Sequence, residues 1–195
     1  MKRSLKAGLR GVFALMAWPL ALLSLFGKSR AGYLTGAHLV ALGPGILGDY
    51  LRGAYYRWTL KACSTECRIS FGVIFSNPDA TVEDGVYIGP YSVLGRVRLG
   101  RNAQLASLVQ VLSGARQHGR NEKGELLTGE VGEFEAVEIG ANCWIGAAAI
   151  VMATVGEAST VGAGAVVTKE IPPRVIAVGN PARVLRSLDE SENKS

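Results

Sequence analysis

The clearest pattern along the chain is a six-residue repeat of aliphatic side chains, most regular over residues 137–167. The aliphatic series reads Ile139, Ile145, Val151, Val155, Val161 and Val167, with a single four-residue step in its middle. Neither the 3.6-residue period of a helix nor the two-residue period of a plain strand produces this spacing. A fixed short period indicates stacked coils, and hexapeptide repeats are typical of a parallel β-helix.

The repeat begins earlier, at Ile69, and continues less regularly to Val111 before a single interruption. Each hexapeptide supplies one short strand and one corner of a triangular coil, with its aliphatic residue inside. At about eighteen residues per coil, the repeat predicts four to five coils. One coil cannot bury its own core, so the coils must stack. The short step from Val151 to Val155 predicts a tightened coil at that point.

This pattern divides the chain into three parts. Residues 62–171 are predicted to form the β-helix, an all-β solenoid, and residues 1–61 an apolar and basic α-helical segment before it. Residues 172–195 are expected to supply a strand, a short cap helix over 182–188 and a disordered polar tail. Pro172 and Pro173 cannot donate to a strand ladder, so they end the last coil. The cap helix is expected because an uncovered coil end exposes unpaired backbone.

Charge is concentrated at the N-terminus. Residues 1–61 hold nine lysines and arginines against one aspartate, while the rest of the chain holds 12 basic and 15 acidic residues. The net charge of +5 is therefore a property of the N-terminal segment. It does not indicate a nucleic-acid-binding domain, which would carry its basic residues on the folded body.

The apolar run in this segment, residues 12–26, is too short to span a bilayer as a straight helix. It contains 15 uncharged residues, against about 20 for a span, and Pro19 interrupts it. Lys28 and Arg30 follow it where a signal peptide would have a cleavage site. Aromatic and basic residues over 50–58 suit a membrane–water interface.

Three interpretations of residues 1–61 stay open. The first is monotopic attachment to an anionic membrane surface, which would place the protein peripherally on the cytoplasmic face of the inner membrane. The second is that the helices pack on the β-helix or on another subunit as ordinary core. The third is a single transmembrane span.

The three cysteines predict reduced thiols in a cytosolic protein. Cys63 and Cys67 have no second pair of ligands nearby, so we expect packing residues and no metal site. Cys143 occupies a corner position of the repeat that requires a small side chain.

The interruption of the repeat, residues 112–136, is a candidate catalytic loop. Long stretches without apolar periodicity inside a compact fold are usually functional or disordered. The stretch contains His118, the single histidine outside the N-terminal segment. An imidazole suits general-base work because its pKa lies near neutrality. The charged composition of the loop fits equally well a solvated segment in which His118 faces water.

Several motifs resemble the hexapeptide-repeat acyltransferases, a superfamily that includes serine, maltose and galactoside acetyltransferases. Besides the repeat, they are the Trp-Ile-Gly at 144–146, the run at 161–169 and the Gly-Asn-Pro-Ala-Arg at 179–183. The resemblance covers about residues 69–186. Segments 44–56, 71–91 and 113–140 look like the branch that modifies exopolysaccharides and lipid-linked sugars.

The resemblance implies a left-handed parallel β-helix that forms homotrimers, with active sites between subunits and an extended loop reaching across. Acetyl-CoA or another acyl-CoA would be the donor, and no metal would be needed. The catalytic histidine of the family matches His118, which would act as general base toward an acceptor hydroxyl. Ser113 is expected to shape the loop. The positions that match coenzyme A contacts of the family are Trp144 at the acyl pocket, Gly146, Ala147 and Ala163 through the backbone, and Thr168, Lys169, Arg183 and Arg186 near the nucleotide phosphates.

The sequence is therefore consistent with three functions. The first is an acyl-CoA-dependent O-acetyltransferase acting on a sugar hydroxyl of an exopolysaccharide or lipid-linked glycan precursor. The second is the same chemistry on a small soluble acceptor such as serine or a free sugar. The third is a non-enzymatic β-helix that scaffolds polysaccharide enzymes.

Overall fold

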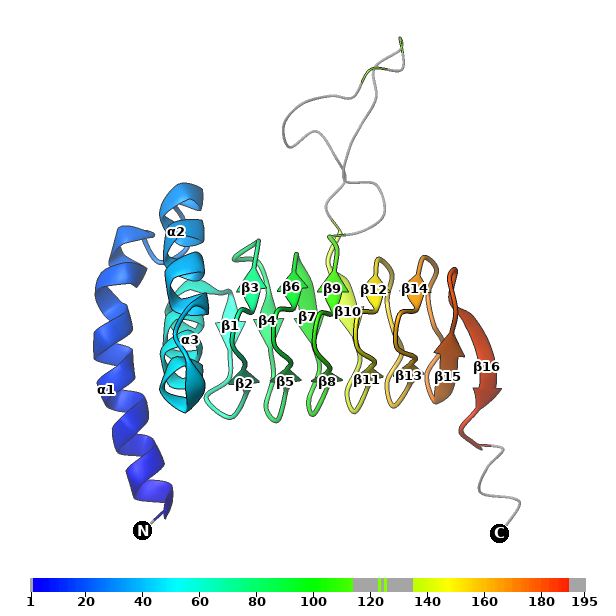
Figure 1. Ribbon diagram of the computed structural model, residues 1–195, viewed down its shortest axis with the longest axis horizontal. Helices are drawn as coiled ribbons and strands as arrows, with labels where there is room; N and C mark the ends of the chain where they lie inside the picture. Colours follow the sequence, from blue (N-terminus) through cyan, green and yellow to red (C-terminus); the bar gives the residue numbers. More distant parts are fainter. Residues whose placement is uncertain (1, 114–122, 124, 126–134, 190–195) are drawn as a thin grey trace.

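Three helices cover one end of a β-helix, and a β-hairpin closes the other end (Figure 1). The computed structural model describes residues 2–113, 123, 125 and 135–189. The helices are α1 Lys2–Leu23, α2 Arg30–Ala41 and α3 Gly45–Thr59. No helix within these described residues is both long and apolar enough to cross a bilayer.

Sixteen short strands follow the helices in the described part of the chain. They are β1 Ala62–Cys63, β2 Arg68–Ile69, β3 Ile74–Phe75, β4 Thr81–Val82, β5 Tyr87–Ile88, β6 Val93–Leu94, β7 Val97–Leu99, β8 Gln104–Leu105, β9 Gln110–Val111, β10 Val137–Ile139, β11 Trp144–Ile145, β12 Ile150–Val151, β13 Thr160–Val161, β14 Val166–Val167, β15 Val175–Val178 and β16 Arg183–Ser187.

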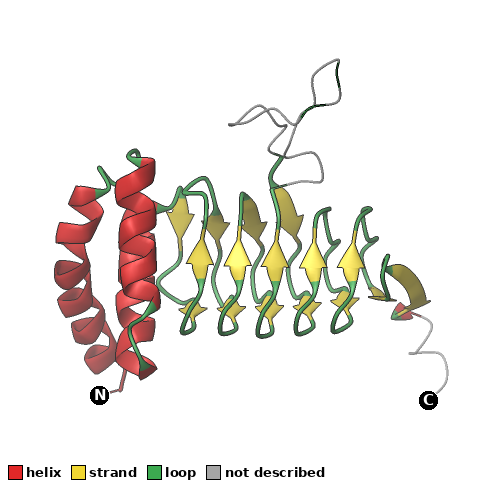
Figure 2. Ribbon diagram, turned by 45° about the horizontal axis from the view of Figure 1, so that its top comes forward, coloured by secondary structure: helices red, strands yellow, loops and turns green. Residues whose placement is uncertain are grey.

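These strands form three sheets, one for each side of the coil (Figure 2). Sheet A contains β1, β4, β7 and β10, and sheet C contains β3, β6, β9, β12 and β14. Sheet B runs β2, β5, β8, β11, β13 and β15, with β16 at its end. All neighbouring strands are parallel except β15 and β16. The predicted parallel β-helix is confirmed.

The aliphatic positions of the repeat form inward rows because side chains on a strand alternate between its two faces. In sheet B the inward row contains Ile69, Ile88, Leu105, Ile145, Val161 and Ala177, all buried. Stacking therefore gives each coil the apolar neighbours that it lacks alone.

The four-residue step tightens the coil as the sequence predicts. Val155 does not extend into a strand and forms a single bridge to Ile139 on one side and Ile171 on the other. Paired positions here lie 16 residues apart, as in Ile145 and Val161. Ile69 and Ile88, in the first coils, lie 19 residues apart.

The predicted cap helix over 182–188 is wrong. Residues Arg183–Ser187 form β16, which pairs antiparallel with β15. The last parallel strand leaves a row of backbone N–H and C=O groups at the edge of sheet B. An antiparallel strand hydrogen-bonds to that row, which a helix cannot do. The strand predicted over 175–178 is confirmed as β15.

The helical cap is joined to the first coils by buried aromatic residues. Tyr56 packs edge-on against Phe75 with ring centroids 4.9 Å apart, and its hydroxyl accepts from the Phe75 N–H at 3.2 Å. Tyr55 donates to the carbonyl of Tyr33 at 2.7 Å, which ties α3 to α2. Because buried tyrosine hydroxyls need such partners, these bonds fix how the helices sit on the coil.

Arg52, on α3, is fully buried and bonds the cap to the coil through several carbonyl groups. Its Nε donates to Ile69 of β2 at 3.0 Å, and one terminal nitrogen donates to Gly43 at 2.6 Å and Val40 at 3.2 Å. The other terminal nitrogen bonds Asp49 at 2.6 Å. Burial lowers the pKa of the Arg52 guanidinium, and the bond to Asp49 opposes that shift.

We expect Arg52→Met to destabilise the protein by about 3–5 kcal/mol. The substitution keeps side-chain length but leaves buried carbonyl groups and Asp49 without their donor. Urea unfolding followed by circular dichroism measures the change. Arg98→Met, at an exposed position on β7, is the matched control and should stay within about 0.5 kcal/mol of wild type. Equal effects of the two substitutions would contradict this role for Arg52.

Candidate functional site

One outward-facing row of side chains crosses sheet B from end to end. In register, it contains Arg68, Tyr87, Gln104, Trp144, Thr160, Ile176 and Arg186. Trp144 stands at the middle of this row and is 59% exposed. With strands about 4.8 Å apart, it lies about 14 Å from the backbone of Arg68 in one direction and of Arg186 in the other.

Four of the predicted coenzyme A contacts lie together at the corner that follows this row. Gly146 and Ala147 leave β11 toward sheet C, and Ala163 leaves β13 one coil further on. The carbonyl of Ala147 accepts from the Gly164 N–H at 2.8 Å. A Cβ at Gly146 would lie 2.4 Å from the backbone nitrogen of Ala163, so only glycine allows this close stacking.

The other four predicted contacts form two separate groups. Arg183 and Arg186 lie on β16, at the end of sheet B, and both are exposed. Thr168 and Lys169 follow β14 at the corner between sheets C and A, and they are also exposed. Sheet C therefore separates Thr168 and Lys169 from the corner at Gly146 within one chain.

His118 lies outside the described residues. The strands on either side of the candidate loop, β9 and β10, belong to sheets C and A, so the loop leaves the β-helix at the corner between them. At its base, the buried Ser113 accepts a hydrogen bond from the Arg96 backbone N–H at 2.8 Å. This bond fixes the second residue of the loop to the coil below it.

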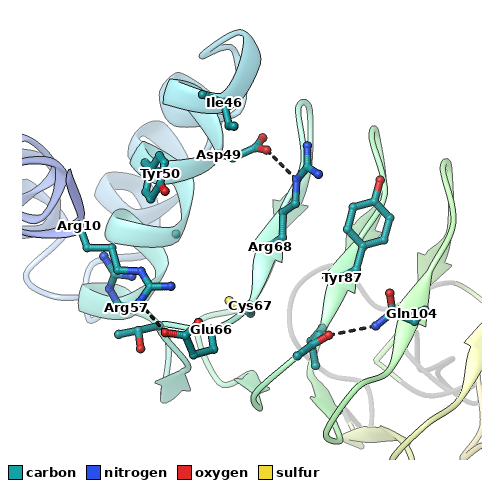
Figure 3. A pocket seen from close by; sticks show the side chains of 14 residues that line it. Arg10, Ile46, Asp49, Tyr50, Arg57, Glu66, Cys67, Arg68, Tyr87 and Gln104 are labelled. Carbon is teal, nitrogen blue, oxygen red and sulfur yellow. Dashed lines mark hydrogen bonds and ion pairs between the residues drawn. The ribbon is translucent and has the colours of Figure 1, made fainter. Parts of the chain in front are cut away.

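A pocket of about 440 Å³ lies where α1 and α3 meet the first strands of sheet B (Figure 3). Its lining includes Arg10, Tyr50, Arg57, Arg68, Tyr87 and Gln104. The amino-acid sequence does not predict this pocket. Tyr50 and Arg57 belong to the aromatic and basic cluster that the sequence shows, but their convergence with Arg68 depends on how the cap packs.

Cys63 and Cys67 lie beside this pocket with their sulfur atoms 3.7 Å apart. Both pack against the apolar core, in agreement with the packing role predicted for them. The hydrogen bond between the thiols lowers the pKa of Cys67 and raises that of Cys63 well above its ordinary value. Arg57 and Arg10 add to the lowering at Cys67 because they favour its thiolate.

Cys143 occupies the buried corner position that the repeat predicts for it. Its sulfur donates to the carbonyl of Gly156 at 3.0 Å. Burial raises the pKa of this thiol, which makes it a packing residue with low reactivity.

Comparison with known proteins places the repeat in a recognised class. Residues 136–169 match a family model described as the hexapeptide repeat of succinyl-transferase. The galactoside O-acetyltransferase of Escherichia coli is 42% identical over 66 residues, which are 33% of this chain and 32% of that protein. The chain spans between 28% and 50% of the length of the curated relatives that it matches.

Solved structures share the fold over most of the chain. A galactoside acetyltransferase in complex with coenzyme A matches with a TM-score of 0.62 and 22% identity, over 90% of this chain and 86% of that one. A maltose O-acetyltransferase from Clostridium difficile matches with a TM-score of 0.62 and 23% identity, over 86% of this chain and 90% of that one. The β-solenoid described above thus matches the left-handed β-helix of these acetyltransferases.

We expect Cys67 to be alkylated by iodoacetamide faster than Cys63 at pH 7.5, because the thiolate is the reactive form and its pKa is lowered. The rate should rise with pH through a midpoint below that of an ordinary thiol. Peptide mass spectrometry after timed alkylation measures both rates. Arg57→Gln should slow the reaction at Cys67, whereas Arg98→Gln should not. Faster alkylation of Cys63 would contradict the assignment.

Proposed function

We propose, from the premise that this chain belongs to the hexapeptide-repeat acyltransferase superfamily, that it transfers an acetyl or similar acyl group from coenzyme A to a sugar hydroxyl. The acceptor is a sugar of an exopolysaccharide or a lipid-linked glycan precursor. One observation carries the proposal: an exposed Trp144 stands beside a corner where Gly146 is buried and Ala147 and Ala163 are exposed.

This corner suits the acyl end of the donor. The indole of Trp144 offers an apolar surface to an acyl group, and the backbone at Ala147 and Ala163 can bond the amides of a pantetheine arm. Arg183 and Arg186 lie further along the same sheet, where guanidinium groups form strong charge-assisted bonds with phosphates. Thr168 and Lys169 lie on the other side of sheet C, so in one chain they are less well placed to share these phosphates.

His118 supplies the base in this proposal. The imidazole takes the proton from the acceptor hydroxyl as its oxygen attacks the thioester carbonyl. A C–O bond forms, the C–S bond breaks, and the proton can pass to the departing thiolate. The acyl group moves directly from sulfur to oxygen, without a covalent bond to the enzyme.

The outer faces of the sheets support assembly into a homotrimer. The outward row of sheet C contains Ile74, Val93, Gln110, Ile150 and Val166, of which four are apolar. In sheet A the outward row contains Ala62, Thr81, Arg98 and Glu138, of which three are polar. Apolar rows that are at least partly exposed favour contact between subunits.

The helical cap supports attachment to a membrane surface. On α1, the apolar side chains of Val12, Leu15, Met16, Leu22 and Leu23 are exposed and recur at helical spacing. They belong to α1, which is the outermost helix at this end of the molecule (Figure 1). An apolar helix face beside basic residues is typical of helices that lie in the interface of an anionic membrane. Such attachment would hold the enzyme on the cytoplasmic leaflet, close to lipid-linked acceptors.

We expect His118→Ala to reduce acceptor-dependent thiol release from acetyl-CoA by about 10²–10⁴-fold, the usual contribution of a general base. Thiol release is measured with a panel of glycan acceptors in native-like membranes. His38→Ala, which changes an exposed histidine on α2, should leave the rate unchanged. Turnover that persists in His118→Ala would remove the base from the mechanism. If wild type neither binds nor consumes acyl-CoA, the transferase proposal fails and the scaffold interpretation replaces it.

We expect Leu15→Glu to weaken binding to phosphatidylglycerol vesicles by at least about tenfold, since burying a leucine side chain contributes about 1.5–3 kcal/mol. Vesicle co-sedimentation measures the change. Leu185→Glu on β16 is the matched control, because this leucine is 65% exposed at the opposite end of the molecule, against 77% for Leu15. Equal loss in both variants, or none in Leu15→Glu, would contradict attachment through α1.

A further inference from the structure

The pocket between the cap and sheet B gathers three guanidinium groups from three different elements. Arg10 comes from α1, Arg57 from α3 and Arg68 from β2, and all line one space of about 440 Å³ (Figure 3). Glu66 and Asp49 also line the pocket and balance two of these charges, so the pocket keeps an excess of positive charge that favours an anionic occupant.

The carboxylates in the pocket are already engaged. Glu66 is paired with Arg10. Asp49 accepts from Arg68 at 2.9 Å and from the buried Arg52 at 2.6 Å, so one carboxylate is shared by two guanidinium groups.

Arg57 is the pocket arginine that is not paired with either of these carboxylates. It forms no ion pair or hydrogen bond with any residue in the part of the chain that the structure describes. Its charge instead favours the thiolate of Cys67 at the pocket wall. A guanidinium with free donors is well suited to bind a phosphate group in a bidentate manner.

The surroundings of the pocket indicate what kind of anion it takes. On one side Arg10 stands on α1 two residues before Val12, where the exposed apolar stripe begins. On the other side Gln104 pairs in register with Trp144, the residue placed at the acyl group of the donor. A lipid-linked sugar has the same three parts in the same order: an apolar chain, a phosphate or diphosphate, and a sugar.

We propose that this pocket binds the phosphate or diphosphate group of the acceptor, and that the acceptor is therefore a lipid-linked sugar phosphate. The inference rests on the proposed function, which places acyl transfer at Trp144. The backbone of Arg68 lies three strands from Trp144, about 14 Å, which leaves space for the sugar between the anion and the donor. In the proposed function, the phosphates of coenzyme A lie at the opposite end of sheet B, near Arg186 of the row and Arg183 of the same strand.

The test measures binding directly and does not depend on turnover. Inorganic diphosphate and geranyl diphosphate are titrated calorimetrically into the full-length protein in detergent. We expect both to bind, geranyl diphosphate more tightly, and Arg57→Gln to weaken both by at least about tenfold through loss of a charge-assisted contact. Arg98→Gln, an exposed arginine on sheet A, should leave both unchanged, and coenzyme A should bind all three proteins equally.

Several results would overturn the proposal. These are no binding of either diphosphate, an equal effect of Arg57→Gln and Arg98→Gln, or a loss of coenzyme A binding in Arg57→Gln. A separate competition experiment uses short-chain phosphatidylglycerol, a bilayer lipid. If it displaces geranyl diphosphate at equal concentration, the pocket is a site for bilayer headgroups and not for the acceptor.

Failure of the pocket and failure of the enzyme give different results. If diphosphate binding depends on Arg57 but acyl-CoA is never consumed, the pocket proposal holds and the proposed function fails. If lipid-linked acceptors are acetylated but Arg57→Gln changes neither KM nor kcat, the function holds and the pocket proposal fails. The proposal requires a KM for the lipid-linked acceptor at least about tenfold higher, with little change in kcat.

Discussion

The buried guanidinium of Arg52 determines how the helical cap meets the β-helix. A charge without water must find partners for all of its donors, and here these are carbonyl groups of the α2–α3 turn, the carbonyl of Ile69 and the carboxylate of Asp49. Because one side chain contacts both the turn and β2, α3 can occupy only one position on the first coil. That position makes Tyr50 and Arg57 line the same pocket as Arg68, so the pocket is a consequence of the way the cap is held.

The three outer faces of the solenoid differ although its interior is uniform. Every coil contributes similar aliphatic residues inward, as at Ile145 and Val161. Outward positions are free of that constraint, and each sheet uses them differently. The outward row of sheet A is mostly polar, that of sheet C is mostly apolar, and that of sheet B carries aromatic and basic residues on either side of Trp144. The proposed subunit contact on sheet C and the proposed ligand sites on sheet B both depend on this difference.

The sequence predicts well those structural features that recur in every coil. The six-residue period alone predicts which residues point inward and where the corner at Gly146 lies, so the local geometry around Trp144 follows from a single motif.

Features that depend on packing between segments distant in the sequence could not be predicted from the repeat. The pocket requires α3, which carries Arg57, to pack beside β2, which carries Arg68. The strand at 183–187 replaced the predicted helix because the edge of β15 needed backbone partners, which composition alone does not reveal. His118 lies outside the described residues, so its role stays a prediction from resemblance.

The central claim is that Trp144 divides the outward row of sheet B into a donor half and an acceptor half. A crystal structure of the protein with coenzyme A tests it most directly. The account predicts that the thiol lies beside Trp144 and that the nucleotide phosphates extend toward Arg186. Phosphates found against Arg57 and Arg68, or coenzyme A bound along the outer face of sheet A, would contradict it.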